Sequence, residues 1–378
     1  MHLTLHLTTA CNMRCGYCYS PPCDRPAMDL ATGRNALLFG SRLSDDSCGI
    51  VFFGGEPLLH KGLIRNLVAF GREIEDGDHG RFHFKATTNG VLLDEEFLDF
   101  SLREDVLIAM SFDGVPEAQN RHRRLRDGSA SFDFLLPRLQ MLLAARPYSA
   151  VISVVNPDTA AFLSQSVSFL LDQGCRYLIV SPNYAAPWDL RSLGILKEQL
   201  AELGELYVKW TEEGRKFYLS PFEVKISSHV NRHCHQKERC ELAQRQLSVD
   251  PDGNLFPCVQ FTRAGVDSEW CIGNLETGID EAKRGRIHDE SERTKVPCAD
   301  CAIADRCNSS CGCLNWQATG SVNQVSPVLC HYEQMTLTVA DRIGKRLFKK
   351  KNALFLHKHY NAAYPVLSLL EEADTDGM

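Results

Sequence analysis

Short apolar runs rich in β-branched and aromatic residues recur six times in the first half of the chain, separated by amphipathic stretches. The runs are 3–8, 50–53, 82–87, 106–112, 150–155 and 177–180, and the clearest amphipathic stretches are 29–43, 63–74, 131–145 and 158–171. Strands that alternate with helices of this length form right-handed β-α-β units and a parallel sheet. The pattern predicts an α/β fold, a partial (β/α)6 TIM-like barrel, with its active site at the carboxyl ends of the strands.

Three cysteines follow the first run directly, with three and then two residues between them: Cys11, Cys15 and Cys18. Three thiolates on one short loop can hold three irons of a 4Fe–4S cube and leave the fourth iron open for a cofactor. We therefore predict that these cysteines are metal ligands and part of the catalytic centre. A zinc loop is the alternative interpretation of the spacing alone.

The loop resembles the signature of radical S-adenosylmethionine (radical SAM) enzymes, in which an aromatic residue, here Tyr17, precedes the last cysteine. The resemblance implies that the open iron chelates SAM. One-electron cleavage of SAM then gives a 5′-deoxyadenosyl radical that abstracts a hydrogen atom from the substrate. In such enzymes the cofactor carries the chemistry and the protein supplies position.

A second motif, Gly54-Gly55-Glu56-Pro57, follows the second run and resembles the GGEP motif of the same family. Glycines let the backbone approach a ligand closely, and a carboxylate can pair with an ammonium group. The resemblance implies that this segment binds the amino group of SAM, although a plain β-turn would have the same composition. The other SAM contacts expected from the resemblance are Tyr17, Asn89, Ser111, Asp113, Arg123 and Asn156.

Arg123 is the expected partner of the SAM carboxylate, because a guanidinium fork suits a carboxylate. Arg121, Arg124 and Arg126 compete for this role, and a solvated basic loop is the plain alternative. Asn156 is expected to contact the ribose of SAM. The turns that hold Asn89, Ser111 and Asp113 also have the composition of ordinary turns.

Near residue 220 the strand–helix alternation stops and cysteines become dense. An Asp252-Gly253 pair between the apolar runs 247–249 and 255–256 predicts a β-hairpin. This half resembles the SPASM extension of radical SAM enzymes. The resemblance implies two auxiliary 4Fe–4S clusters, three in all, although paired cysteines also suit structural zinc. The implied ligands are Cys234, Cys240, Cys258 and Cys311 for the first cluster, and Cys298, Cys301, Cys307 and Cys330 for the second.

We expect three parts: a radical SAM barrel over 1–220, a small α+β SPASM domain over 221–335, and a helical tail over 336–378. A chain of 378 residues exceeds the usual single core, which favours two domains. Five cysteines have no assigned role: Cys23, Cys48, Cys175, Cys271 and Cys313. Cys23 and Cys313 lie beside ligand runs, where they are either alternative ligands or have no role. Cys48 and Cys175 lie among apolar residues, so we expect them to be buried thiols.

The net charge of −7 argues against a nucleic-acid partner, which would select a basic surface. No run of about 18 apolar residues predicts a membrane span. The chain has 16 cysteines, and no secretion signal precedes the first run. Cysteines in that context indicate metal or redox ligands in a reducing, cytoplasmic location.

The resemblance implies an enzyme that oxidatively modifies a peptide or protein, and we favour a maturase that cross-links side chains of a ribosomally made peptide. Sulfatase-maturing relatives, which form formylglycine, carry an aspartate directly after the third cysteine of the first auxiliary cluster. This chain has Val259 and then Gln260, and neither can act as a base at neutral pH. His122, Asp113 and Tyr184 stay open as bases. Eight cysteines would fill both auxiliary clusters, which favours electron acceptance over substrate binding.

The expected partners are a peptide substrate and a reductant such as flavodoxin or ferredoxin. We expect no leader-recognition domain before the first strand, so either a separate protein presents the leader or the barrel and hairpin bind the peptide directly, for example by strand addition. The alternatives are a small-molecule SPASM dehydrogenase or epimerase, and a multi-cluster electron carrier. An open iron argues against the carrier, which does not need one.

Overall fold

The computed structural model describes residues 1–19, 26–44, 46–75, 80–230 and 240–361. Cys23 and Cys234 lie outside the described residues. Within the described segments, no helix combines the length and apolar character needed to cross a membrane.

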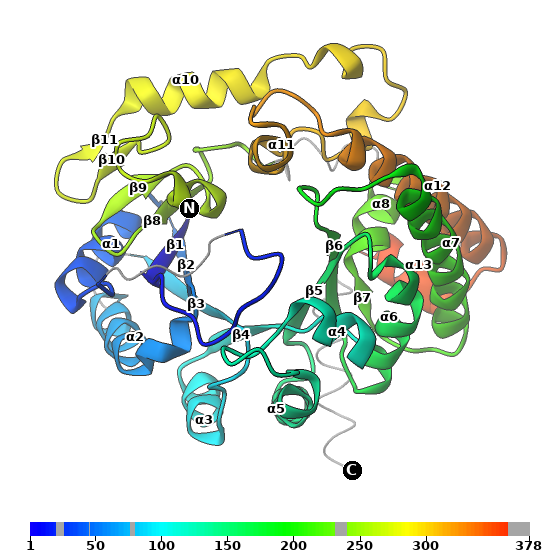
Figure 1. Cartoon of the computed structure of the whole chain (residues 1–378), viewed down its shortest axis with the longest axis horizontal. Coiled ribbons are helices and arrows are strands. Elements are labelled where there is room, and N and C mark those ends of the chain that lie inside the picture. The colour runs from blue at the N-terminus through cyan, green and yellow to red at the C-terminus, as the bar shows by residue number, and fades with distance from the viewer. Residues whose placement is uncertain (20–25, 45, 76–79, 231–239, 362–378) are drawn as a thin grey trace.

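One curved sheet organises the molecule, and its strands follow the order β11-β10-β9-β8-β1-β2-β3-β4-β5-β6-β7 (Figure 1). Neighbouring strands from β1 to β7 are parallel. Their bounds are β1 His2–Thr8, β2 Ser47–Gly54, β3 Arg81–Thr88, β4 Val106–Ser111, β5 Ala150–Val155, β6 Tyr177–Pro182 and β7 Tyr218–Leu219. The sheet does not close on itself, so the predicted α/β partial barrel is confirmed.

Helices cover the outer face of the parallel strands (Figure 1). They are α1 Leu30–Arg42, α2 Lys61–Glu75, α3 Glu95–Arg103, α4 Pro116–His122, α5 Phe132–Ala145, α6 Leu163–Asp172 and α7 Leu190–Glu212, with short 3-10 turns η1 Pro57–His60 and η2 Ala160–Phe162. Asp29 begins α1 by accepting a 2.7 Å hydrogen bond from the Thr32 amide. Gly40 of α1 packs directly against Leu3 of β1. Because side chains alternate along a strand, His6 faces the opposite, inner side of the barrel.

The second half of the chain extends the same sheet. β8 (Gln246–Val249) pairs in parallel with β1, and β9 (Asn254–Phe256) turns back antiparallel to β8, as the hairpin prediction requires. The Asp250 carboxylate stabilises the turn by accepting hydrogen bonds from the Asp252 and Asn254 amides. β10 (Gly273–Asn274) and β11 (Gly278–Ile279) complete the edge. Independent folding of 1–220 and 221–335 stays a prediction.

The remaining elements pack around the end of the barrel. They are α8 Ser220–Val230, η3 Val259–Ala264, α10 Glu281–Glu292, η4 Val296–Cys298, η5 Ala304–Arg306, α11 Gly312–Thr319, α12 Pro327–Lys349 and α13 Ala353–Tyr360. The helical periodicity noted after residue 335 belongs to α12, which begins at Pro327, where Ser326 caps it. α12 packs against α7 through close contact of Val339 with Gly204. A buried ion pair of 2.5 Å between Lys225 and Glu333 joins α12 to α8.

Candidate active site

The cysteine loop directly follows β1 and so lies at its carboxyl end. Backbone hydrogen bonds to the end of α4 and the segment after it hold the loop in place. The Gly16 amide donates to the His122 carbonyl at 2.9 Å, and the Arg14 amide donates to the Arg124 carbonyl at 2.9 Å. These bonds hold the loop across the mouth of the barrel.

A cavity of about 310 Å³ lies at this end of the barrel, and we call it the thiol cavity. Its lining includes nine of the predicted residues: Cys11, Cys15, Tyr17, Cys18, Gly54, Gly55, Asn89, Ser111 and Arg123. Glu56, Asp113 and Asn156 are buried beside it but do not line it. The structure therefore brings together motifs from β1 to β5 that lie far apart in the sequence.

The two glycines of the second motif are required by close backbone contact. Gly54 has φ +126°, and a Cβ atom there would lie 2.3 Å from the Thr8 carbonyl oxygen. A Cβ atom at Gly55 would lie 2.1 Å from the Ala10 carbonyl oxygen. The Gly55 amide also donates to Thr8 at 2.8 Å. A side chain at either position would push away the segment that leads into Cys11.

The Glu56 carboxylate is fully buried and holds the end of β3. It accepts hydrogen bonds from the amides of Leu58 at 3.0 Å and Asn89 at 2.7 Å, and from the Thr88 hydroxyl at 2.7 Å. Burial raises the pKa of Glu56, and these hydrogen bonds oppose the rise. Asn89 in turn donates from Nδ2 to Cys11 Sγ at 3.5 Å. Glu56 thus positions Asn89 beside the thiols, while its contact with SAM stays a prediction.

Arg123 is the one arginine of its loop that reaches the thiol cavity. Its Nη1 donates to Tyr17 Oη at 2.9 Å, and Tyr17 Oη donates to Asp113 Oδ2 at 2.8 Å. Burial alone would lower the pKa of Arg123, but Tyr17, Cys15 and Asp113 outweigh it and raise the pKa. The three competing arginines, Arg121, Arg124 and Arg126, are exposed. Arg121 forms an ion pair with Asp158.

The buried donors beside the cavity that have no hydrogen-bond partner among the described residues include Arg123 Nε and Asn156 Nδ2. Asn156 lies behind the lining, where its Oδ1 accepts a 2.9 Å hydrogen bond from Asn183 Nδ2. Buried polar groups are normally satisfied, so donors of this kind are typical of a site that a polar ligand completes.

None of the three candidate bases is arranged for proton transfer in this cavity. His122 Nε2 lies 2.8 Å from Asp158 Oδ1, outside the lining. The Asp113 carboxylate already accepts from Tyr17 and from the Val154 amide. Tyr184 does line the cavity, but burial raises its pKa well above the ordinary value.

Several lining residues were not predicted as site residues from the sequence. Ser181, Pro182 and Asn183 form one wall together with Tyr184, which was considered only as a base. The only sequence signal of the first three is position, because they follow the sixth predicted strand at its carboxyl end. Tyr19, Leu314 and Gln317 also line the cavity, as does Gln260, which the sequence singles out only as unable to act as a base. Gln260, Leu314 and Gln317 belong to the second half, and their approach to the barrel depends on long-range packing.

The second-half cysteines form two neighbourhoods. Cys240, Cys258 and Cys311 gather beside β8 together with Cys313, which had no assigned role. The other neighbourhood contains Cys298, Cys301 and Cys330. Burial is the main cause that raises the pKa of Cys330, and the nearby thiols of Cys301 and Cys298 raise it further. Cys307 lies beside the Lys225–Glu333 pair, and burial raises its pKa to about 12. Cys48 and Cys175 are buried, as expected.

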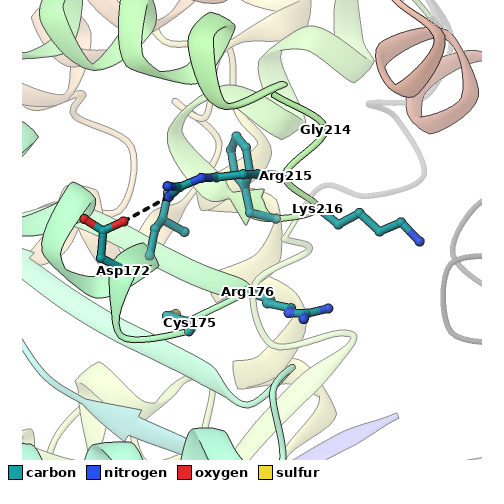
Figure 2. Close-up of a pocket in the computed structure, with 9 residues that line it drawn as sticks. Asp172, Cys175, Arg176, Gly214, Arg215 and Lys216 are labelled. Carbon is teal, nitrogen blue, oxygen red and sulfur yellow. Dashed lines mark hydrogen bonds and ion pairs between the residues drawn. The ribbon is translucent and has the colours of Figure 1, made fainter. Parts of the chain in front are cut away.

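No three His, Cys, Asp or Glu side chains among the described residues converge as ligands of a single metal ion. A larger hollow of about 560 Å³ lies away from the thiol cavity, and Cys175 is among its lining residues (Figure 2). It is lined by the segments that precede β6 and β7, including Asp172 and Arg215, whose ion pair measures 2.9 Å. It therefore lies at the amino ends of the strands, opposite the thiol cavity.

Residues 5–160 match the Radical SAM superfamily. The chain carries a radical SAM domain. The chain is 22% identical over 335 residues to the cysteine-type anaerobic sulfatase-maturating enzyme of Clostridium novyi, and the alignment covers 80% of this chain and 84% of that enzyme. It is 21% identical over 344 residues to the radical SAM cyclopropyl synthase TigE of Paramaledivibacter caminithermalis, and that alignment covers 82% of this chain and 67% of TigE. The protein is an enzyme.

Two solved structures share their fold with most of the chain. Native anSMEcpe with bound AdoMet and Cp18Cys peptide has a TM-score of 0.79 at 17% identity, covering 92% of this chain and 99% of that chain. SuiB of Streptococcus suis bound to precursor peptide SuiA has a TM-score of 0.60 at 17% identity, and the match covers 87% of this chain and 75% of that chain.

A radical SAM domain implies one 4Fe–4S cluster and SAM, and the residues of the thiol cavity fit both. Three thiols from one loop line the cavity, which suits a cube with one open iron. The unpartnered Arg123 Nε and Asn156 Nδ2 donors suit a ligand with a carboxylate and hydroxyl groups.

Proposed function

We propose that this protein is a radical SAM peptide maturase that removes hydrogen from side chains of a ribosomally made peptide and joins them oxidatively. When bound, the cluster and SAM supply the 5′-deoxyadenosyl radical. The observation that carries the proposal is the thiol cavity, where the cysteine loop, Gly54-Gly55 and Arg123 meet residues from the second half.

The chain's own residues hold SAM and shape the cavity. Cys11, Cys15 and Cys18 would bind three irons. Arg123, fixed by Tyr17, would pair with the SAM carboxylate, and Asn156 would approach the ribose through its free Nδ2. Arg123 and Asn156 are buried, so water has limited access to this side of the cavity.

The cavity lining favours cross-linking over formylglycine formation. Among the described residues, no aspartate, glutamate or histidine lines it. A general base must lie within hydrogen-bond reach of the proton that it removes. Gln260, which follows Cys258 by two residues, places an amide in the lining where a base would be needed. An amide can form hydrogen bonds but cannot accept a proton at neutral pH.

Gln260 and Tyr19 suit the recognition of a peptide group. Gln260 Oε1 and Tyr19 Oη are buried and have no hydrogen-bond partner among the described residues, and both residues line the cavity. One offers an acceptor and the other a donor. A substrate backbone carries one N–H and one C=O per residue, so the two side chains can satisfy one residue of an extended peptide.

Auxiliary clusters and partners complete the proposal. The second-half thiols would bind two further 4Fe–4S clusters that accept the substrate electron, and a flavodoxin or ferredoxin would reduce the SAM-binding cluster. A separate leader-binding protein is a further partner if the barrel alone does not bind the precursor. Thiolate ligands stay reduced in the cytosol, where we propose that the enzyme works.

Sulfatase maturation is the second candidate function, because several of the relatives carry that name. The two candidates differ in substrate. We would incubate the holoenzyme, SAM and reductant with either a sulfatase-derived cysteine peptide or a short precursor peptide sought among the genes that neighbour this one. Modification of the precursor peptide alone supports our proposal, and formylglycine in the sulfatase peptide would contradict it.

A further inference from the structure

The hollow opposite the thiol cavity carries an excess of positive charge, and we call it the amino-end hollow (Figure 2). It lies at the amino ends of β6 and β7 and has a volume of about 560 Å³. Among the described residues, its charged lining consists of Arg176, Arg215, Lys216 and Asp172. Three cations therefore gather with one carboxylate, in a chain whose net charge is −7.

The cations come from two loops that lie side by side. The Tyr218 amide donates to the Arg176 carbonyl at 2.7 Å, which joins the starts of β6 and β7. Arg215 Nη1 forms a 2.9 Å ion pair with Asp172 between the two loops. The Arg176 guanidinium lies 5.6 Å from the centre of the Tyr148 ring, in a cation–π contact. These contacts hold both guanidinium groups at the hollow.

Helix capping does not explain the cations. α6 and α7 both end beside the hollow, and cations stabilise the carboxyl ends of helices. Carbonyls in the last turn of each helix, however, already accept backbone hydrogen bonds. The Cys175 amide donates to the Leu170 carbonyl of α6 at 3.1 Å. The Arg215 amide donates to the Trp210 carbonyl of α7 at 2.9 Å. Three cationic side chains therefore exceed what the two helix ends need.

The arrangement favours carboxylates over phosphate. Phosphate groups bind at the amino ends of helices, whereas two helices end here at their carboxyl ends. A carboxylate matches the planar fork of a guanidinium group. Cations on two loops suit several carboxylates spaced along a chain better than one compact anion. Leu171 and Phe217 add an apolar lining. An acidic peptide segment that also carries apolar side chains fits both features.

Arg215 can bind a carboxylate of a ligand at little cost to the fold. The Arg215 and Asp172 side chains are 45% and 56% exposed. Exposed ion pairs of this kind contribute little to stability. A second carboxylate can therefore share Arg215 or replace Asp172.

Strand β6 links the hollow to the thiol cavity. Arg176 directly precedes β6, and Ser181 and Pro182 at the other end of the strand line the cavity. The six residues of β6 span about 20 Å at ~3.3 Å each. A peptide bound in the hollow therefore reaches the thiol cavity only with a spacer of about six extended residues or more.

We propose that the amino-end hollow binds an acidic segment of the peptide substrate and anchors the substrate while a more distant part enters the thiol cavity. Arg176, Arg215 and Lys216 pair with the carboxylates of that segment. The inference rests on the proposed peptide substrate. It adds a substrate property, an acidic segment about six or more residues from the modified side chain.

Fluorescence anisotropy tests this binding without turnover. The probe is a fluorescein-labelled peptide in which glutamates alternate with leucine and serine, and its matched control has glutamine at every glutamate position. The full chain with reconstituted clusters is titrated as the wild type, as Arg176→Glu/Lys216→Glu and as Arg191→Glu/Lys197→Glu. The two variants change the charge equally, and Arg191 and Lys197 are exposed in the first half of α7, away from the hollow. Formation of 5′-deoxyadenosine without peptide checks that both variants fold.

The proposal predicts that the glutamate probe binds the wild type and the α7 variant alike. Arg176→Glu/Lys216→Glu should weaken this binding about tenfold or more. Equal binding to all three proteins would overturn the proposal, as would no binding to the wild type or a glutamine probe that binds as tightly. Displacement of the probe by inorganic phosphate at the same concentration would also overturn it, because the hollow would then be a site for a small anion.

Photo-cross-linking of the wild type locates the probe without any variant. A benzophenone group in the glutamate probe should cross-link to residues 171–176 and 214–217, which mass spectrometry identifies. Cross-links that avoid both segments would overturn the assignment.

The outcomes separate this inference from the proposed function. A probe that binds in the hollow, while no peptide is modified, would contradict only the proposed function. A precursor that the wild type and Arg176→Glu/Lys216→Glu modify with the same KM would contradict only the anchoring role of the hollow.

Discussion

The Arg123 guanidinium donates a 2.9 Å hydrogen bond to the hydroxyl of Tyr17, and so links the end of α4 to the cysteine loop. The same hydroxyl donates to Asp113 at 2.8 Å. One relay therefore fixes the position of a buried cation next to the thiols. This part of the cavity is built by the chain's own side chains, which lowers the cost of ordering it when a ligand binds.

Arg123→Gln should weaken SAM binding about 10- to 100-fold, because it removes a buried, charge-assisted partner of a carboxylate. Titration of the anaerobic holoenzyme with SAM measures the effect. Arg121→Gln is the matched control, since Arg121 is exposed and pairs with Asp158 outside the cavity. Unchanged SAM affinity in Arg123→Gln would show that another group binds the carboxylate.

Gly55→Ala should destabilise the fold by about 2 kcal/mol or more, because the new methyl group would collide with the Ala10 carbonyl. The SAM-binding cluster should be lost first, since Ala10 leads into Cys11. Gly62→Ala is the control. Nothing lies within 4 Å of a Cβ atom there, so this helical position should gain about 0.5 kcal/mol. Thermal unfolding and iron content measure both effects, and equal behaviour of the two variants would contradict the account.

His6 should make stability depend on pH. Burial lowers its pKa to about 4 from 6.5, and Nε2 has no partner among the described residues. As pH falls below 6.5, the unfolded chain binds the proton first. The stability present above pH 6.5 is therefore lost as pH falls toward 4. When the pH falls from 7.5 to 5.5, the free energy of unfolding of His6→Leu should decrease by about 1 kcal/mol less than that of the wild type. Denaturant unfolding at the two pH values measures this difference. The exposed His83→Gln should follow the wild type, and a wild-type slope in His6→Leu would refute the prediction.

Lys225→Met should destabilise the second half by about 3 to 5 kcal/mol, because it leaves the Glu333 carboxylate buried without its cation. Lys225 also donates to the Arg306 carbonyl, and Glu333 accepts from the Asn308 amide, so the pair positions the segment that holds Cys307. Chemical unfolding should show the loss, together with a lower iron content. Lys350→Met should cost under about 1 kcal/mol, since Lys350 forms an exposed pair. A similar cost in both variants would contradict a positioning role.

Gln260→Leu should raise the KM for the peptide about tenfold and leave SAM affinity unchanged, because an unpartnered acceptor in the cavity is lost. Steady-state kinetics with the peptide substrate separates the two effects. Gln173→Leu, which removes a surface amide bonded to Gln140, is the control. A parallel loss of SAM affinity would place Gln260 against the cofactor instead.

The sequence predicted the barrel well because its strands are short apolar runs with turns at both ends. Local signals also located the hairpin and the motifs that meet at the thiol cavity, since carboxyl ends of parallel strands share one edge. The sequence did not predict that Gln246 pairs beside His2 in the sheet, because no local pattern encodes contacts across more than 200 residues. For the same reason the wall at Asn183 was missed, and the burial of the Glu56 carboxylate against Asn89 could not be predicted.

The central claim is that the enzyme binds SAM in the thiol cavity and uses it to oxidise a peptide. The most direct measurement is the mass of a short precursor peptide, sought among the genes that neighbour this one, after anaerobic incubation with holoenzyme, SAM and reductant, with 5′-deoxyadenosine quantified in the same sample. The account predicts a loss of about two hydrogens per cross-link and 5′-deoxyadenosine in matching amount. An unchanged peptide beside abundant 5′-deoxyadenosine would contradict the substrate, and no 5′-deoxyadenosine from protein with full clusters would contradict the chemistry itself.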